Sequence, residues 1–142
     1  MKRLSYILTI LVSICFMSSC EEEVVYPTFN APGWTVVDNP NYSVSMTVIA
    51  SIPDYIAKNA QLGDELAVFA GDQCRGVGKK VGDVYYIMVD GTDNENPTLE
   101  FRYYSAGNRY MYRTNNTYQF KANGMIGTVE APEKLLLEII KE

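Results

Sequence analysis

Turn-forming residues interrupt this chain at short intervals, and that spacing constrains the fold more than any other feature. From residue 33 onward, runs rich in Val, Ile, Thr, Tyr and Phe are cut every ~8–12 residues by Gly, Asn, Asp and Pro. Such intervals are typical of an all-β sandwich or barrel. We therefore predict one immunoglobulin-like antiparallel β-sandwich over residues 33–142.

The predicted strands follow from these runs. They cover residues 33–37, 42–50, 66–70, 73–77, 84–89, 98–106, 109–114 and 135–140. Only residues 53–61 are helix-like. Two further reversals of the chain are predicted, at Asn-Asn (residues 115–116) and at Asn-Gly (residues 123–124). Together they predict a four-stranded meander between residues 98 and 129.

One hairpin has a register that can be worked out. The dipeptide at residues 107–108 is Gly-Asn, a two-residue hairpin signal. This turn places Tyr104 opposite Met111 and Arg102 opposite Arg113. Since side chains alternate along a strand, these four residues share one face. The other face, predicted to point into the core, carries Phe101, Tyr103, Tyr110 and Tyr112.

The face with two opposed arginines is the first candidate binding surface. Like charges directly opposite each other destabilise a sheet, and a carboxylate, including one on an acidic ligand, relieves that repulsion. We take Arg102, Tyr104 and Arg113 as candidate ligand contacts; the alternative is a solvent face on which the arginine stems lie along Tyr104. Trp34 either stacks on a sugar from an exposed position or is buried at one end of the sandwich.

The first twenty residues have the pattern of a secretory signal. Lys2 and Arg3 precede a short apolar run, and residues 17–20 read Met-Ser-Ser-Cys. This ending resembles the lipobox of bacterial lipoproteins, which implies cleavage before Cys20 and lipid on its thiol. Ordinary cleavage, with Cys20 left as a plain thiol, is the alternative.

An acidic run follows the cysteine. Residues 21–23 are all Glu, which resembles the export signals of Bacteroidota surface lipoproteins; a solvated start to a tether explains the same residues. We predict a signal peptide over residues 1–19, a lipidated tether over residues 20–32, and an outer-membrane location facing the cell exterior.

Charge and composition exclude several functions. Loss of Lys2 and Arg3 leaves 10 basic against 17 acidic residues, a net charge of −7, which disfavours nucleic acid. The chain has no histidine, so Ser-His-Asp and Cys-His catalysis are excluded, and Cys74 is best explained as a buried structural thiol. Carboxylate-only hydrolysis stays formally open, but no spacing selects a pair, and we predict no enzyme.

Calcium is the one cofactor that the sequence suggests. Residues 90–96 read DGTDNEN, which brings Asp90, Asp93 and Glu95 into one loop. Calcium takes six to eight such oxygen ligands. Turns use the same residue types without metal, and the spacing does not match an EF-hand.

Residues 64–77, DELAVFAGDQCRGV, resemble a segment of β-sandwich modules in secreted and surface proteins of the Bacteroidota. The resemblance extends to residues 45–48 (SMTV) and 99–104 (LEFRYY), and so covers nearly the whole domain. It implies that Cys74 points inward, Arg75 points outward, and Gly76 occupies a site without room for a side chain.

The resemblance also suggests a function, through the class of proteins that it points to. Small lipoproteins of this phylum accompany TonB-dependent outer-membrane importers of glycans or peptides. The first hypothesis is therefore an accessory ligand-binding or docking subunit of such an import system. The second is an adhesion or structural lipoprotein that binds a protein partner.

Overall fold

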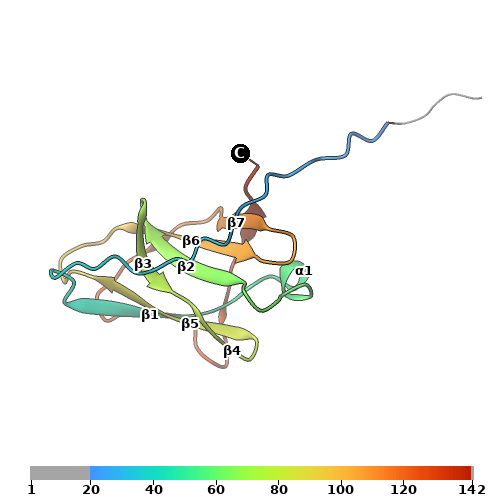
Figure 1. Ribbon diagram of the computed structural model, residues 1–142. Coiled ribbons are helices and arrows are strands. Elements are labelled where there is room, and N and C mark those ends of the chain that lie inside the picture. Colours follow the sequence, from blue (N-terminus) through green and yellow to red (C-terminus); the bar gives the residue numbers. More distant parts are fainter. Residues whose placement is uncertain (1–19, 142) are drawn as a thin grey trace, which may run out of the picture.

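The computed structural model describes residues 20–141, so the signal predicted over residues 1–19 lies outside the described part (Figure 1). Two β-sheets pack face to face, which confirms the all-β sandwich. The elements are β1 (Val44–Ser51), α1 (Asp54–Ala57), β2 (Glu65–Ala70), β3 (Gln73–Val77), β4 (Lys79–Val81), β5 (Val84–Gly91), β6 (Thr98–Ser105), β7 (Tyr110–Thr114), β8 (Tyr118–Gln119), β9 (Met125–Ile126), β10 (Glu133–Lys134) and β11 (Leu137–Ile139). Within residues 20–141 no helix is long and apolar enough to cross a bilayer.

The two sheets differ in strand order. Sheet A runs β10-β1-β5-β4, with β9 also paired to β1. Sheet B runs β11-β7-β6-β2-β3, with β8 paired to β6. Most pairs are antiparallel, but β9 and β10 both lie parallel to β1. Strand β11 therefore ends sheet B on one side, and β3 ends it on the other.

The core lies between the sheets and follows the alternation of the strands. Val48 of β1 and Val89 of β5 face Val68 of β2 and Phe101 of β6, and all four are fully buried. A smaller apolar cluster lies on the outer face of sheet B, where Ala67, Phe69 and Cys74 are buried.

The register predicted for the central hairpin is confirmed. Tyr104 pairs with Met111 and Arg102 with Arg113, as the turn at residues 107–108 requires. The turn itself is longer than predicted: the Arg109 amide donates to the Ser105 carbonyl, and Arg109, rather than Gly107, takes the left-handed conformation at φ 63°. Register was thus predictable, whereas the turn type was not.

The predicted meander is wrong beyond that hairpin. Residues 115–117 form no reversal: β8 continues alongside β6 with the register shifted by two residues, so these residues bulge from an interrupted strand. The chain then leaves sheet B, and β9 joins sheet A beside β1. Strand β4, whose three residues are all exposed, was not predicted either.

Residues 33–37 form no strand, which corrects the first predicted element. They belong instead to an extended segment, residues 26–37, that crosses the outer face of sheet B (Figure 1). We call this segment the N-terminal strap. The packed part of the chain therefore begins at Tyr26, inside the range predicted as tether.

Candidate ligand-binding groove

The N-terminal strap is fastened along its length. The Phe29 amide donates to the Arg109 carbonyl at 2.8 Å, and the Arg109 Nε donates back to the Phe29 carbonyl at 3.1 Å. Further on, the Gly33 and Trp34 amides both donate to the Glu65 carboxylate, at 3.1 and 3.0 Å. Gly33 has a φ of +58°, a left-handed conformation that favours glycine at this bend.

The strap covers the face that the sequence suggested for ligand. Tyr104 is 4% exposed, and its hydroxyl points to the Phe29 carbonyl at 3.4 Å. Met111, its cross-strand neighbour, is also buried. Tyr104 is therefore a strap contact rather than an open ligand contact, and this corrects the prediction for the face.

Trp34 takes neither of the two predicted positions. Its ring is half-buried and packs edge-on against Phe69, with ring centroids 5.5 Å apart. Cys74 lies in the same cluster, and burial raises the pKa of its thiol. Trp34 thus seals the outer apolar cluster of sheet B, which gives it a structural role.

The two opposed arginines have different environments. Arg102 donates from Nε to Glu100 at 2.6 Å, and its guanidinium lies 4.2 Å from the Phe69 ring centroid. The carboxylate that relieves the repulsion between the two arginines therefore belongs to the protein itself, at Glu100. Arg113 is exposed and lies opposite Glu138 in the register of β7 and β11. Its side chain makes no ion pair within residues 20–141.

The loop predicted to bind calcium uses its main carboxylate internally. Arg75 donates to both oxygens of Glu95, at 2.8 and 3.3 Å, and also to the Asp90 carbonyl at 3.1 Å. The Glu95 carboxylate also accepts from the Thr92 amide at 2.7 Å. Asp93 is exposed, and within residues 20–141 no three carboxylate or thiol side chains are placed to share a metal ion. Calcium stays a prediction.

Cys74 and Arg75 both correct the orientation that the resemblance implied, because Cys74 belongs to the cluster on the outer face of sheet B and Arg75 points to the opposite face. Arg75 is only 6% exposed and lies 4.2 Å from the Tyr42 ring centroid. Because of its hydrogen bonds, the Glu95 carboxyl has a pKa below its ordinary value. Gly76 is as predicted, since a Cβ there would lie 2.6 Å from the Met88 carbonyl oxygen.

Two carboxylate pairs could be named for hydrolysis: Asp64 with Glu65, and Asp72 with Asp83. The second pair is exposed, and the first is engaged within the fold. Asp64 accepts hydrogen bonds from the Tyr103 hydroxyl at 2.6 Å and the Ala106 amide at 2.7 Å. Burial, and then this bond to Asp64, raise the pKa of Tyr103. Glu65 holds the strap. Both acids therefore position backbone.

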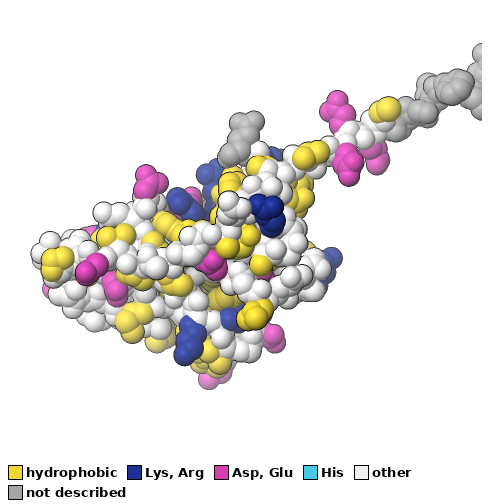
Figure 2. Space-filling model, viewed as in Figure 1, with side chains coloured by type: hydrophobic (Ala, Val, Ile, Leu, Met, Phe, Trp, Pro, Cys, Tyr) yellow, Lys and Arg dark blue, Asp and Glu magenta, His cyan; other side chains and the backbone are white. Residues whose placement is uncertain are grey.

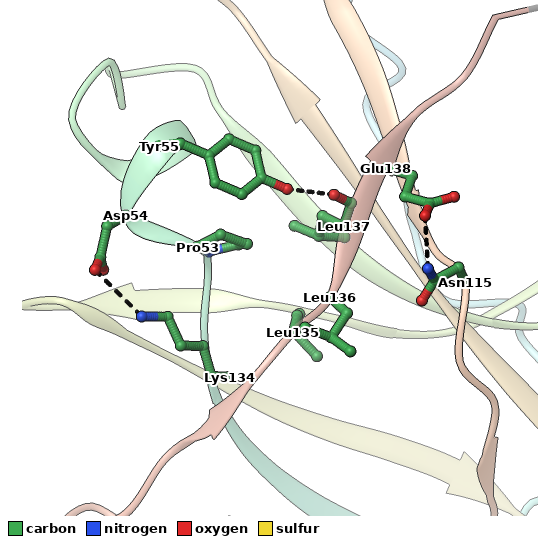
Figure 3. A pocket seen from close by; sticks show the side chains of 9 residues that line it. All are labelled: Pro53, Asp54, Tyr55, Asn115, Lys134, Leu135, Leu136, Leu137 and Glu138. Carbon is green, nitrogen blue, oxygen red and sulfur yellow. Dashed lines mark hydrogen bonds and ion pairs between the residues drawn. The ribbon is translucent and has the colours of Figure 1, made fainter.

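An open groove lies beside α1 and β11, at the end of the sandwich away from the loop at residues 90–96 (Figure 3). It has a volume of about 620 Å³. Leu136, which is 58% exposed, contributes apolar surface to it, and the buried Pro53 and Leu135 lie along the same wall. Tyr55 stands at one side and donates its hydroxyl to the Leu137 carbonyl.

A second hollow of about 500 Å³ adjoins the first. The two share Tyr55, Leu137 and Glu138 in their linings. Its other aromatic residues are Tyr26, Tyr110 and Tyr112. We call the two hollows together the tyrosine groove. Tyr55, 57% exposed, is the aromatic platform between them.

Polar groups are placed at the rim of the tyrosine groove. Lys134 pairs with Asp54 at 3.2 Å, and Asn115 donates to Glu138 at 2.6 Å (Figure 3). Burial raises the pKa of the Tyr55 phenol, and Tyr112 and Glu138 act in the same direction, so the hydroxyl remains a donor at neutral pH. The groove thus offers apolar and aromatic contact flanked by hydrogen-bonding groups, the usual composition of a ligand site.

Of the four predicted contact residues, only Arg113 flanks this groove, because it lies beside Glu138 on the same face. Sequence reasoning missed Tyr55, Leu136 and Glu138. The available signal was an aromatic residue on the single helix-like segment, and nothing in the sequence paired that segment with β11.

No family model matches this chain, and neither a curated protein nor a solved structure matches it. The candidate site therefore rests on geometry.

Proposed function

We propose that this chain is a lipoprotein anchored through Cys20 to the outer face of the outer membrane. In this proposal it is an accessory ligand-binding or docking subunit of a TonB-dependent importer of glycans or peptides. The tyrosine groove is the contact surface. The observation that carries the proposal is the exposed Tyr55 ring, which lines both hollows, whereas Tyr104, Trp34, Arg102 and Glu95 are engaged in contacts within the domain.

The chemistry of the groove suits either kind of contact. A tyrosine ring stacks on the apolar face of a sugar or packs against an apolar side chain, while its hydroxyl and nearby amide or carboxylate groups hydrogen-bond. Truncation of a hot-spot aromatic contact in a binding site costs about 2 kcal/mol or more, which is more than a tenfold loss of affinity.

The N-terminal segment supports the anchored location. Cys20 is exposed, and acidic side chains gather on the extended stretch that leads away from the domain (Figure 2). A lipid on Cys20 would therefore not clash with the fold. The first test is metabolic labelling with a palmitate analogue: wild type should incorporate label and fractionate with membranes, and Cys20→Ala should do neither.

The second test is a gentle detergent pull-down from native membranes, with a tag inserted in the exposed turn at residues 82–83. The C-terminus is not used because Lys141 lines the groove. We expect stoichiometric recovery of an importer, lost in Tyr55→Ala and retained in Tyr86→Ala, a tyrosine on the outer face of sheet A. Recovery of adhesin subunits instead would favour the second hypothesis.

A further inference from the structure

The strap makes the free tether short. The first residue packed on the domain is Tyr26, whose ring meets Tyr110 edge-on with centroids 5.6 Å apart. Five residues, 21–25, separate it from Cys20. At ~3.3–3.6 Å per residue, the chain from Cys20 to Tyr26 spans at most about 22 Å.

The same residue connects the tether to the groove. Tyr26 begins the strap and also lines the second hollow. The groove therefore lies where the tether leaves the domain. The Asp90 end lies farther away, because β1 runs from Val44, paired with Gly91, to Ser51 just before α1. Eight residues of strand correspond to roughly 26 Å.

The groove also borders an open strand edge. Strand β11 is an edge strand of sheet B. The residues on either side of it bond toward β7: the Leu136 carbonyl accepts from the Asn115 amide, and the Ile140 amide donates to the Met111 carbonyl. By antiparallel alternation, the backbone groups of Leu137 and Ile139 point away from β7. The Leu137 carbonyl accepts the Tyr55 hydroxyl, so the groups offered to an added strand are the Leu137 amide and the backbone amide and carbonyl of Ile139. An extended segment can add to such an edge while its side chains enter adjacent pockets.

We propose that the strap holds the tyrosine groove toward the membrane that carries Cys20, and that the groove receives an extended apolar loop of a protein embedded in that membrane. This rests on the lipid anchor of the proposed function. Two observations select a protein loop over the lipid surface. The groove is concave, and the anchor is followed by Glu21, Glu22 and Glu23, which repel anionic headgroups.

The test is photo-cross-linking in native membranes with the full lipidated chain. A photoreactive phenylalanine analogue replaces Leu136 in the groove or, as matched control, Asp93 at the far end; both sites are exposed. We expect an adduct with an integral membrane protein from position 136 and none from position 93. Adducts with lipid alone, equal adducts from both positions, or no adduct from position 136 would overturn the proposal.

A spacer tests the role of the short tether. Insertion of about 18 Gly/Ser residues after Val25 lengthens the chain between Cys20 and Tyr26 roughly fourfold. Effective concentration falls roughly as the −3/2 power of length, so the position 136 adduct should fall roughly eightfold. An unchanged yield would contradict the orientation. Palmitate labelling of the same samples separates a failed anchor, which would sink the proposed function, from a wrong orientation on an intact anchor.

Discussion

The two ends of the sandwich both pair their polar groups but differ in how far their aromatic groups are exposed. At the Asp90 end, Arg75 and Glu95 are paired, and Arg75 lies against Tyr42. At the α1 end, Tyr55 and Leu136 stay exposed beside hollows. The first end resembled a binding loop in the sequence, yet its groups satisfy each other. The comparison teaches that exposed aromatic and apolar surface, rather than residue type, distinguishes a candidate binding surface from a structural one.

The largest effect should come from breaking the structural end. Glu95→Ala leaves the buried Arg75 guanidinium without its carboxylate, which should cost about 3 kcal/mol in free energy of unfolding. For a domain of this size that lowers Tm by about 10 °C, measured by thermal denaturation. Asp93→Ala, an exposed control in the same loop, should change stability by less than about 0.5 kcal/mol. Equal effects would show that the ion pair is not structural.

Truncation at the other end should give the reverse result. Tyr55→Ala removes the ring between the hollows and should weaken partner binding at least ~tenfold, measured by titration of the partner recovered in the pull-down. Within residues 20–141 its side chain makes one hydrogen bond, a part-buried one to the Leu137 carbonyl, so stability should fall by no more than about 1 kcal/mol. A loss of stability as large as that of Glu95→Ala would erase the proposed difference between the ends.

Acid should weaken the structural end with a defined sign. The folded-state pKa of Glu95 is below its ordinary value, chiefly through the hydrogen bond from Arg75. Its contribution is therefore present above the unfolded pKa, near 4.5, and is lost as pH falls through the folded pKa. Glu95→Gln should flatten stability against pH below about 4.5, measured by urea unfolding at several pH values. An unaltered acid profile would assign the acid sensitivity elsewhere.

The same comparison explains what the sequence could reveal. Alternation and turn residues predicted the sandwich and the pairing of Tyr104 with Met111, because strand faces and hairpin register are local properties. The strap was not predictable, because the segment at residues 26–37 has no periodicity and its docking depends on Glu65 and Arg109, which are distant in sequence. The docked strap covers Tyr104 and so explains its burial. The groove likewise requires Tyr55 and Leu137 to meet across 82 positions.

The smallest and sharpest test uses the two arginines that the sequence treated as equivalent. Arg102 is paired with Glu100 and stacked on Phe69, so Arg102→Ala should cost about 1 kcal/mol of stability and leave binding unchanged. Arg113 is unpaired within residues 20–141 and flanks the groove, so Arg113→Ala should leave stability within about 0.5 kcal/mol. It should weaken partner binding a few-fold, roughly the effect of a rim charge. If the two substitutions instead exchange these effects, ligand contact belongs to the strap-covered face and the tyrosine groove is not the site.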